Sequence, residues 1–229
     1  MGYWENTTYV QHGSVADVAS RLASLFAKEG MAPVETPPQH AHRGIGEAMQ
    51  YDDALHNDLW GVAVFPGAPS WTIVKTAPLE LLGERRPGAD WMRLAEACAA
   101  IAASAVQVNV YDSIGIVLVE VSPEGEVLLS GFNDRGPNPF VWHSERLDEA
   151  TAMPRFRLHP FGNVQGPGLN STKIARELAA SLGGGNEEFC DNAVSVDTLV
   201  THKPLDARGG VVSYFRWQGP SRGRSGGRG

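Results

Sequence analysis

Histidine and aspartate side chains gather in one stretch of the chain, residues 40–58. The stretch contains His40, His42, Asp52, Asp53, His56 and Asp58. If residues 51–57 form a helix, Asp52 and His56 lie one turn apart on one face, and a His-x-His loop can complete a shell of nitrogen and oxygen ligands. The candidate metal site is therefore His40, His42, Asp52 and His56. Its spacing matches no defined zinc or two-metal motif. The same residue types also occur in solvent-exposed loops and helix caps that bind no metal.

The sequence gives little indication of nucleophilic catalysis or of phosphate binding. There is no Gly-x-Ser-x-Gly motif, and neither Cys98 nor Cys190 has a histidine nearby in the sequence. Residues 162–173 form a glycine-containing run into a predicted helix, whose free amide groups can bind an anion. The Walker spacing is missing from this run, however, and Pro167 lacks an N–H donor. We expect an ordinary helix cap there, no catalytic residue and no cofactor.

Aromatic residues mark a candidate surface for a partner. The chain contains six tryptophans, and most of them are expected in the core because of their large apolar area. Trp142 differs, since it lies with Phe140 and His143 in the long Pro- and Gly-rich connection of residues 133–168. Aromatic side chains dominate binding hot spots. We therefore predict a partner-binding site formed by Phe140, Trp142 and His143.

Three amphipathic helices are predicted to position these loops. The first is capped by Ser14, with Asp17 in the place of a capping-box acid, and ends at Gly30. The second begins at Asp90 and carries its small and apolar residues at helical spacing. These residues are Leu94, Ala95, Cys98, Ile101, Ala102 and Ala105. The third covers residues 171–182 and ends at a run of three glycines.

Strands are predicted around these helices from alternating or continuous apolar runs. The expected strands cover residues 3–11, 31–35, 59–65, 71–76, 106–110, 116–121, 127–132, 194–201 and 211–217. Two pairs of them are joined by turns rich in proline and glycine, at residues 66–70 and 122–125. Runs such as Val-Ala-Val-Phe are nearly continuously apolar, which indicates strands that are buried on both faces.

The predicted fold is α+β, with mostly antiparallel sheets built from quasi-repeated helix-plus-hairpin units. These units cover about residues 1–80, 85–135 and 165–218, within a single compact domain of residues 1–218. Hairpin connections favour this class over a parallel α/β sheet. Residues 219–229 are a Gly/Arg sequence typical of a flexible tail.

Composition narrows the class of partner. The formal net charge is −7, and three arginines among the last eight residues leave −10 on the rest of the chain. An acidic body disfavours nucleic acid and favours a basic partner. No apolar run approaches the length of a membrane span, and no secretory signal is visible. Two cysteines are too few for a disulfide scaffold, so we expect a cytoplasmic protein without a membrane partner.

The sequence thus favours a soluble, non-catalytic protein that binds another macromolecule, of the immunity, antitoxin or regulatory adaptor type. The main alternative is a metal-assisted hydrolase that uses the His/Asp cluster of residues 40–58. A third possibility is a small-molecule binding protein, with its pocket between the repeated units.

Overall fold

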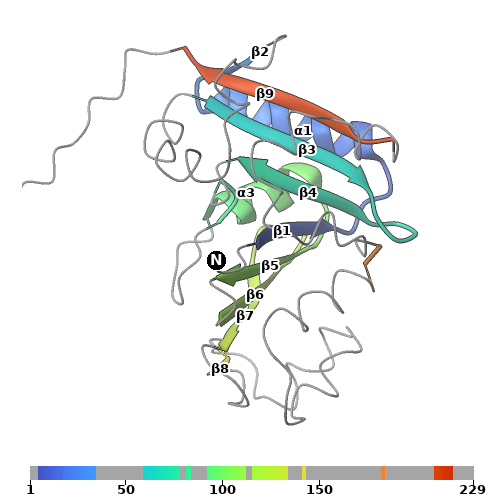
Figure 1. The fold of residues 1–229 in the computed structure, drawn as a ribbon, viewed down its shortest axis with the longest axis vertical. Helices are drawn as coiled ribbons and strands as arrows, with labels where there is room; N and C mark the ends of the chain where they lie inside the picture. The colour runs from blue at the N-terminus through green and yellow to red at the C-terminus, as the bar shows by residue number, and fades with distance from the viewer. Residues whose placement is uncertain are drawn as a thin grey trace, which may run out of the picture.

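One antiparallel sheet organises the described part of the chain, and the two described helices lie on one of its faces (Figure 1). The computed structural model describes residues 5–34, 59–77, 81–83, 92–111, 115–133, 141–142, 182–183 and 209–218. The helices are α1 (Val15–Lys28) and α3 (Met92–Ile101). The strands are β1 (Glu5–Val10), β2 (Met31–Val34), β3 (Leu59–Pro66), β4 (Thr72–Ala77), β5 (Ala105–Tyr111), β6 (Gly115–Val121), β7 (Val127–Asn133), β8 (Val141–Trp142) and β9 (Val211–Trp217).

The strand order in the sheet is β2-β9-β3-β4-β1-β5-β6-β7-β8, and every neighbouring pair is antiparallel. Two strands lie far from their neighbours in the sequence. β1 separates β4 from β5, and β9 is inserted between β2 and β3. The α+β class and its antiparallel pairing are therefore confirmed for the described part of the chain.

Helix α1 begins and ends where its sequence signals predict. Ser14 has an extended backbone and its hydroxyl accepts a hydrogen bond from the Asp17 N–H at 3.2 Å, as an N-cap does. Gly30 follows the helix with φ +86°, a conformation that glycine adopts without steric cost. The capping-box interpretation of Asp17 is wrong in one respect. The Ser14 N–H donates to Nδ1 of His12, while the Asp17 carboxylate pairs with His12 and Arg21.

Helix α3 is shorter than its apolar pattern predicts. It ends at Ile101, and Ala102 has a φ of +56°. The Ala103 N–H donates to the carbonyl of Cys98, which closes the helix end. Ala105 already belongs to β5. The helical spacing continued past the boundary because alanine is compatible with a helix end and with a buried strand.

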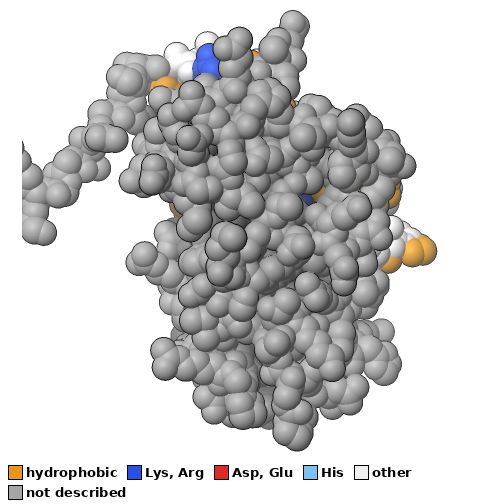
Figure 2. All heavy atoms as spheres, in the orientation of Figure 1, with side chains coloured by type: hydrophobic (Ala, Val, Ile, Leu, Met, Phe, Trp, Pro, Cys, Tyr) orange, Lys and Arg blue, Asp and Glu red, His pale blue; other side chains and the backbone are white. Residues whose placement is uncertain are grey.

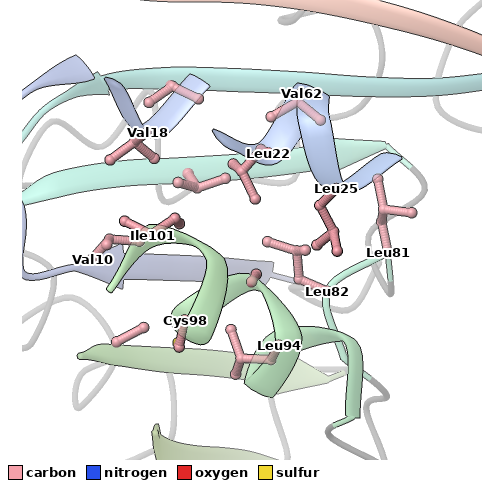
Figure 3. Close-up of a cluster of buried hydrophobic side chains, with 14 of the residues drawn as sticks. Val10, Val18, Leu22, Leu25, Val62, Leu81, Leu82, Leu94, Cys98 and Ile101 are labelled. Carbon is pink, nitrogen blue, oxygen red and sulfur yellow. The ribbon is translucent and has the colours of Figure 1, made fainter. Parts of the chain in front are cut away.

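The main core lies between the two helices and the sheet (Figure 3). Leu22 and Leu25 of α1 and Leu94 and Cys98 of α3 belong to one cluster with valines of the strands. α1 contacts β2, β3 and β9, and α3 contacts α1 and β6. Phe26 packs edge-on against Trp60 and Phe215, with ring centroids 5.1 and 5.2 Å apart. The prediction that most tryptophans are core residues holds for Trp60.

Central strands are buried on both faces, as their continuous apolar runs predict. In β3, Val62 and Val64 face the helices, whereas Ala63 and Phe65, on the opposite face, are also buried. In β6 the same holds for Val117 and Leu118. A space-filling view in the same orientation shows hydrophobic side chains of described residues at the right edge, beside the turn between β3 and β4 (Figure 2).

The described elements of the two predicted helix-plus-hairpin segments come in the same order along the chain but pair differently. After α3, β5 pairs directly with β6 of the following hairpin. After α1, β2 pairs with β9, which separates β2 from the hairpin β3–β4. The third segment is described only at Leu182–Gly183 and in β9. Most of the predicted helix 171–182, the strand 194–201 and the tail 219–229 lie outside the described residues.

Neither described helix has the length and hydropathy that a membrane span needs.

Candidate functional site

The predicted metal site cannot be placed. His40, His42, Asp52 and His56 all lie outside the described residues. Within the part of the chain that the structure describes, no three His, Cys, Asp or Glu side chains gather in an arrangement that could hold a metal ion. The metal site therefore stays a prediction from the sequence.

The predicted partner site falls in part on the edge of the sheet. Trp142 lies in β8, opposite Gly131 of β7, and Val141 lies opposite Phe132. Phe140 and His143, which flank this strand, lie outside the described residues. Among the described strands, β8 is the last on its side of the sheet. Aromatic character was the sequence signal for Trp142, but the sequence did not show that this residue belongs to an edge strand.

The opposite edge of the sheet differs in its backbone chemistry. There β2 is the last of the strands that the structure describes, and it carries Pro33 opposite Phe215 of β9. Proline has no N–H and is characteristic of strands that resist further pairing. β8 has no proline. Proline therefore removes a backbone donor at the β2 edge, whereas both residues of β8 keep their N–H groups.

His12 and Asp17 form an acid–histidine pair whose nitrogens are both occupied. Nε2 of His12 lies 3.1 Å from Oδ2 of Asp17, and Nδ1 accepts the Ser14 N–H at 3.2 Å. A general base needs a nitrogen that can accept a proton from the substrate. In this arrangement the imidazole instead connects the end of β1 to the first turn of α1. The pair is a structural cap of the helix.

Cys98 is not placed to act as a nucleophile. It is 1% exposed, within the core between the helices and the sheet. Burial raises the pKa of its thiol to about 12, which suppresses the thiolate form that reacts. Its position agrees with the expectation that this cysteine acts as a small hydrophobic residue.

A row of uncharged polar side chains crosses the centre of the helix-facing side of the sheet. Alternation along the strands puts these residues on the same side as Val10, Val74 and Ala105 of the core. They are Asn6 and Thr8 of β1 and Gln107 and Asn109 of β5, each no more than 2% exposed. We call these four residues the amide row.

Hydrogen bonds connect only part of the amide row. Nε2 of Gln107 donates to Oγ1 of Thr8 at 3.0 Å, and Nδ2 of Asn109 donates to Oε1 of Gln107 at 3.1 Å. Nδ2 of Asn6 and Oδ1 of Asn109 have no hydrogen-bond partner within the structure, and each exposes less than 1 Å². A buried polar atom without a partner typically costs about 1–3 kcal/mol. The amide row therefore contributes less to the stability of the fold than the buried valines around it.

Sequence reasoning missed the amide row. The alternation of Val106, Val108 and Val110 identifies one apolar face of β5, but it does not show that Gln107 and Asn109 are buried as well. The available signal was the polar composition of Asn6-Thr7-Thr8 in a strand flanked by valine-rich segments.

Comparison with known proteins finds no matching family model, no matching curated protein and no matching solved structure.

Proposed function

We propose that this chain is a non-catalytic protein that binds another protein, and that the partner docks at the β8 edge of the sheet. The observation that supports the proposal is the position of Trp142. A residue chosen from the sequence for its hot-spot character lies in β8, the last strand on its side among the described strands of the sheet. Edge strands present backbone groups on which other chains can pair, and aromatic residues provide binding energy.

Charge indicates the kind of partner. The acidic chain, with a formal net charge of −7, favours a partner with a basic surface. Binding should then weaken as salt screens the attraction between the two proteins. The proposal includes a cytoplasmic location, where a thiol such as Cys98 stays reduced. An immunity, antitoxin or adaptor role is consistent with it.

We also propose that the chain arose by internal duplication of a helix-plus-hairpin unit. It is supported by the shared order of the described helix, strand and hairpin in residues 15–34 with 59–77 and in residues 92–133. The insertion of β9 beside β2 would then be a later departure of the first copy from the common pattern.

The decisive experiment combines site-specific crosslinking with affinity measurement. A photo-crosslinking amino acid at position 143 should capture a stoichiometric partner, whereas the same group at position 211, on β9, should not. With the purified partner, Trp142→Ala should raise the Kd by about 30-fold or more, as for a hot spot worth about 2 kcal/mol. Val211→Ala is the matched control, because Val211 is an exposed apolar strand residue, 39% exposed, in a different strand.

Two results would contradict the proposal. Equal Kd values for Trp142→Ala and the unaltered protein would remove the β8 edge from the interface. Stoichiometric zinc or manganese in the purified protein, together with a metal-dependent rise in Tm, would instead support the hydrolase predicted from His40, His42, Asp52 and His56.

A further inference from the structure

Strand β1 joins two groups of strands that are otherwise separate in the sheet. On one side are β2, β9, β3 and β4, and on the other are β5, β6, β7 and β8. β1 pairs with β4 through Thr8–Val74 and with β5 through Thr8–Gln107 and Asn6–Asn109. The register of this one strand therefore sets how the two groups align.

Hydrophobic patterning alone does not fix that register. A slip of one residue is prevented, because it turns every side chain of β1 to the opposite face. A slip of two residues keeps each side chain on its own face. On the side away from the helices, β5 carries Val106, Val108 and Val110 at alternate positions, so a slip in either direction leaves Thr7 opposite a valine.

The amide row distinguishes the native register from these slips. In the native register Gln107 donates to Thr8. A two-residue slip in one direction brings Val10 opposite Gln107 and Thr8 opposite Asn109. A slip in the other direction brings Thr8 opposite Ala105 and Asn6 opposite Gln107. Either slip breaks the hydrogen bond between Gln107 and Thr8 and puts one buried polar side chain of the row opposite an apolar residue, which is unfavourable.

We infer that the amide row is a register lock, which specifies the pairing of β1 with β5 at the expense of stability. The unpartnered Nδ2 of Asn6 and Oδ1 of Asn109 show that the row is not optimised for stability. Buried polar groups are known to specify register in other folds. Here the lock selects one of several apolar-compatible alignments of the strand that connects the two halves of the sheet.

Cysteine pairs that report register test this inference. In a background with Cys98→Ala and Cys190→Ala, Thr7→Cys is combined with Val108→Cys, its native partner, or with Val106→Cys or Val110→Cys. A disulfide needs Cα atoms within about 7 Å, so the last two pairs close only when β1 slips. The protein is refolded in a glutathione redox buffer, and the crosslinked fraction is measured by peptide mapping.

The lock is removed by replacing the row with apolar residues of similar size: Asn6→Leu, Thr8→Val, Gln107→Leu and Asn109→Leu. We expect this variant to keep or raise its Tm, because unpartnered polar atoms are removed. The shifted crosslinks, which join position 7 to position 106 or 110, should increase at least tenfold. If this variant does not fold, the smaller set Thr8→Val with Gln107→Leu is measured in the same way. Val10→Ala is the control, since it weakens the same face of β1 without touching the row.

Two outcomes overturn the inference. One is a row variant that crosslinks only through positions 7 and 108, as fully as the parent does. The other is an equal increase of shifted crosslinks in Val10→Ala, which would attribute slipping to lost stability alone.

Discussion

Arg93 binds Glu29 through two parallel contacts and so connects the start of α3 to the end of α1. Its Nη2 lies 3.0 Å from Oε2 and its Nε lies 3.2 Å from Oε1. Nη1 donates to the Leu81 carbonyl at 3.0 Å, and the guanidinium carbon lies 4.9 Å from the Trp60 ring centroid. One side chain thereby connects both helices, the 81–83 turn and β3.

Replacement of Arg93 should destabilise the fold more than replacement of another ion-paired arginine. Arg93→Met keeps most of the apolar stem but leaves Glu29, whose side chain is 23% exposed, without its cation. We expect a loss of about 2 kcal/mol in the free energy of unfolding, typical of hydrogen bonds to charged groups. Chemical denaturation provides the measurement.

Arg21→Met is the comparison, because Arg21 is 44% exposed, forms an i,i+4 pair with Asp17 and donates one hydrogen bond to the Ala100 carbonyl of α3. Such pairs contribute below about 1 kcal/mol. A loss in Arg93→Met no larger than in Arg21→Met would mean that the Arg93–Glu29 pair does not hold the helices together.

Gly183 should tolerate alanine far less than Gly209. Both have positive φ, +85° and +71°, which costs a residue with a side chain about 1–2 kcal/mol. An added Cβ on Gly183 would lie 2.0 Å from the Ala68 nitrogen, whereas nothing lies within 4 Å of one on Gly209. Gly183→Ala should therefore lower the unfolding free energy by about 3 kcal/mol or more, as expected for a backbone clash.

Gly209→Ala isolates the cost of the backbone conformation from that of the clash. Thermal and urea unfolding of the two variants should differ clearly. Equal losses would imply that the Leu182–Gly183 segment does not rest on the β3–β4 turn, where the Ala68 N–H donates to the Leu182 carbonyl.

Cys98 should make the protein sensitive to alkaline pH. Burial raises its pKa from 9.0 to about 12, so above pH 9 the unfolded chain loses a proton that the folded protein keeps. The stability contributed by the neutral buried thiol is complete below pH 9 and falls as pH rises toward 12, by about 1.4 kcal/mol per pH unit. Cys98→Ala should flatten the stability profile between pH 9 and 10.

Tyr214 contributes in the same direction at higher pH, since burial raises its pKa from 10.0 to about 12. Tyr214→Phe should therefore flatten the profile only above pH 10. Stability is measured by urea titration at each pH, and identical slopes for Cys98→Ala and the parent between pH 9 and 10 would disprove the assignment.

The Ser14 cap should matter more than a second serine in the same helix. Ser14→Ala removes the acceptor of the Asp17 N–H and should cost about 1 kcal/mol. Ser24, which donates to the Ser20 carbonyl within the helix, should tolerate alanine within about 0.5 kcal/mol, because alanine favours helix. Equal costs in thermal unfolding would argue against the cap.

Local structure was the part of the fold that the sequence predicts well. Val18, Leu22 and Phe26 lie at helical spacing between Ser14 and Gly30, and all three are buried in α1. The strand 211–217 was predicted with its observed bounds. Both signals act within a few residues of each other, through capping and side-chain periodicity, so they are visible without knowledge of the rest of the chain.

Neighbour relations were not predictable in the same way. Nothing in Val211–Trp217 indicates that this strand pairs with both β2 and β3, because a period of two identifies a strand and not its partners. The bidentate contact of Arg93 with Glu29 and the burial of Gln107 also depend on the tertiary arrangement. Of the candidate site residues, only Trp142 lies within the described strands, and all of the residues predicted to bind metal or partner, Trp142 included, stay predictions.

The position of β9 has a consequence for how the chain acquires its structure during synthesis. β2 has β9 as its one strand neighbour in the described sheet. A nascent chain emerges from the ribosome N-terminus first, so α1 and β2 leave the exit tunnel long before their partner strand does. Until residues 211–217 appear, the backbone groups of β3 that pair with β9 remain open to other chains. Chaperone engagement is thus expected to continue until β9 has been synthesised.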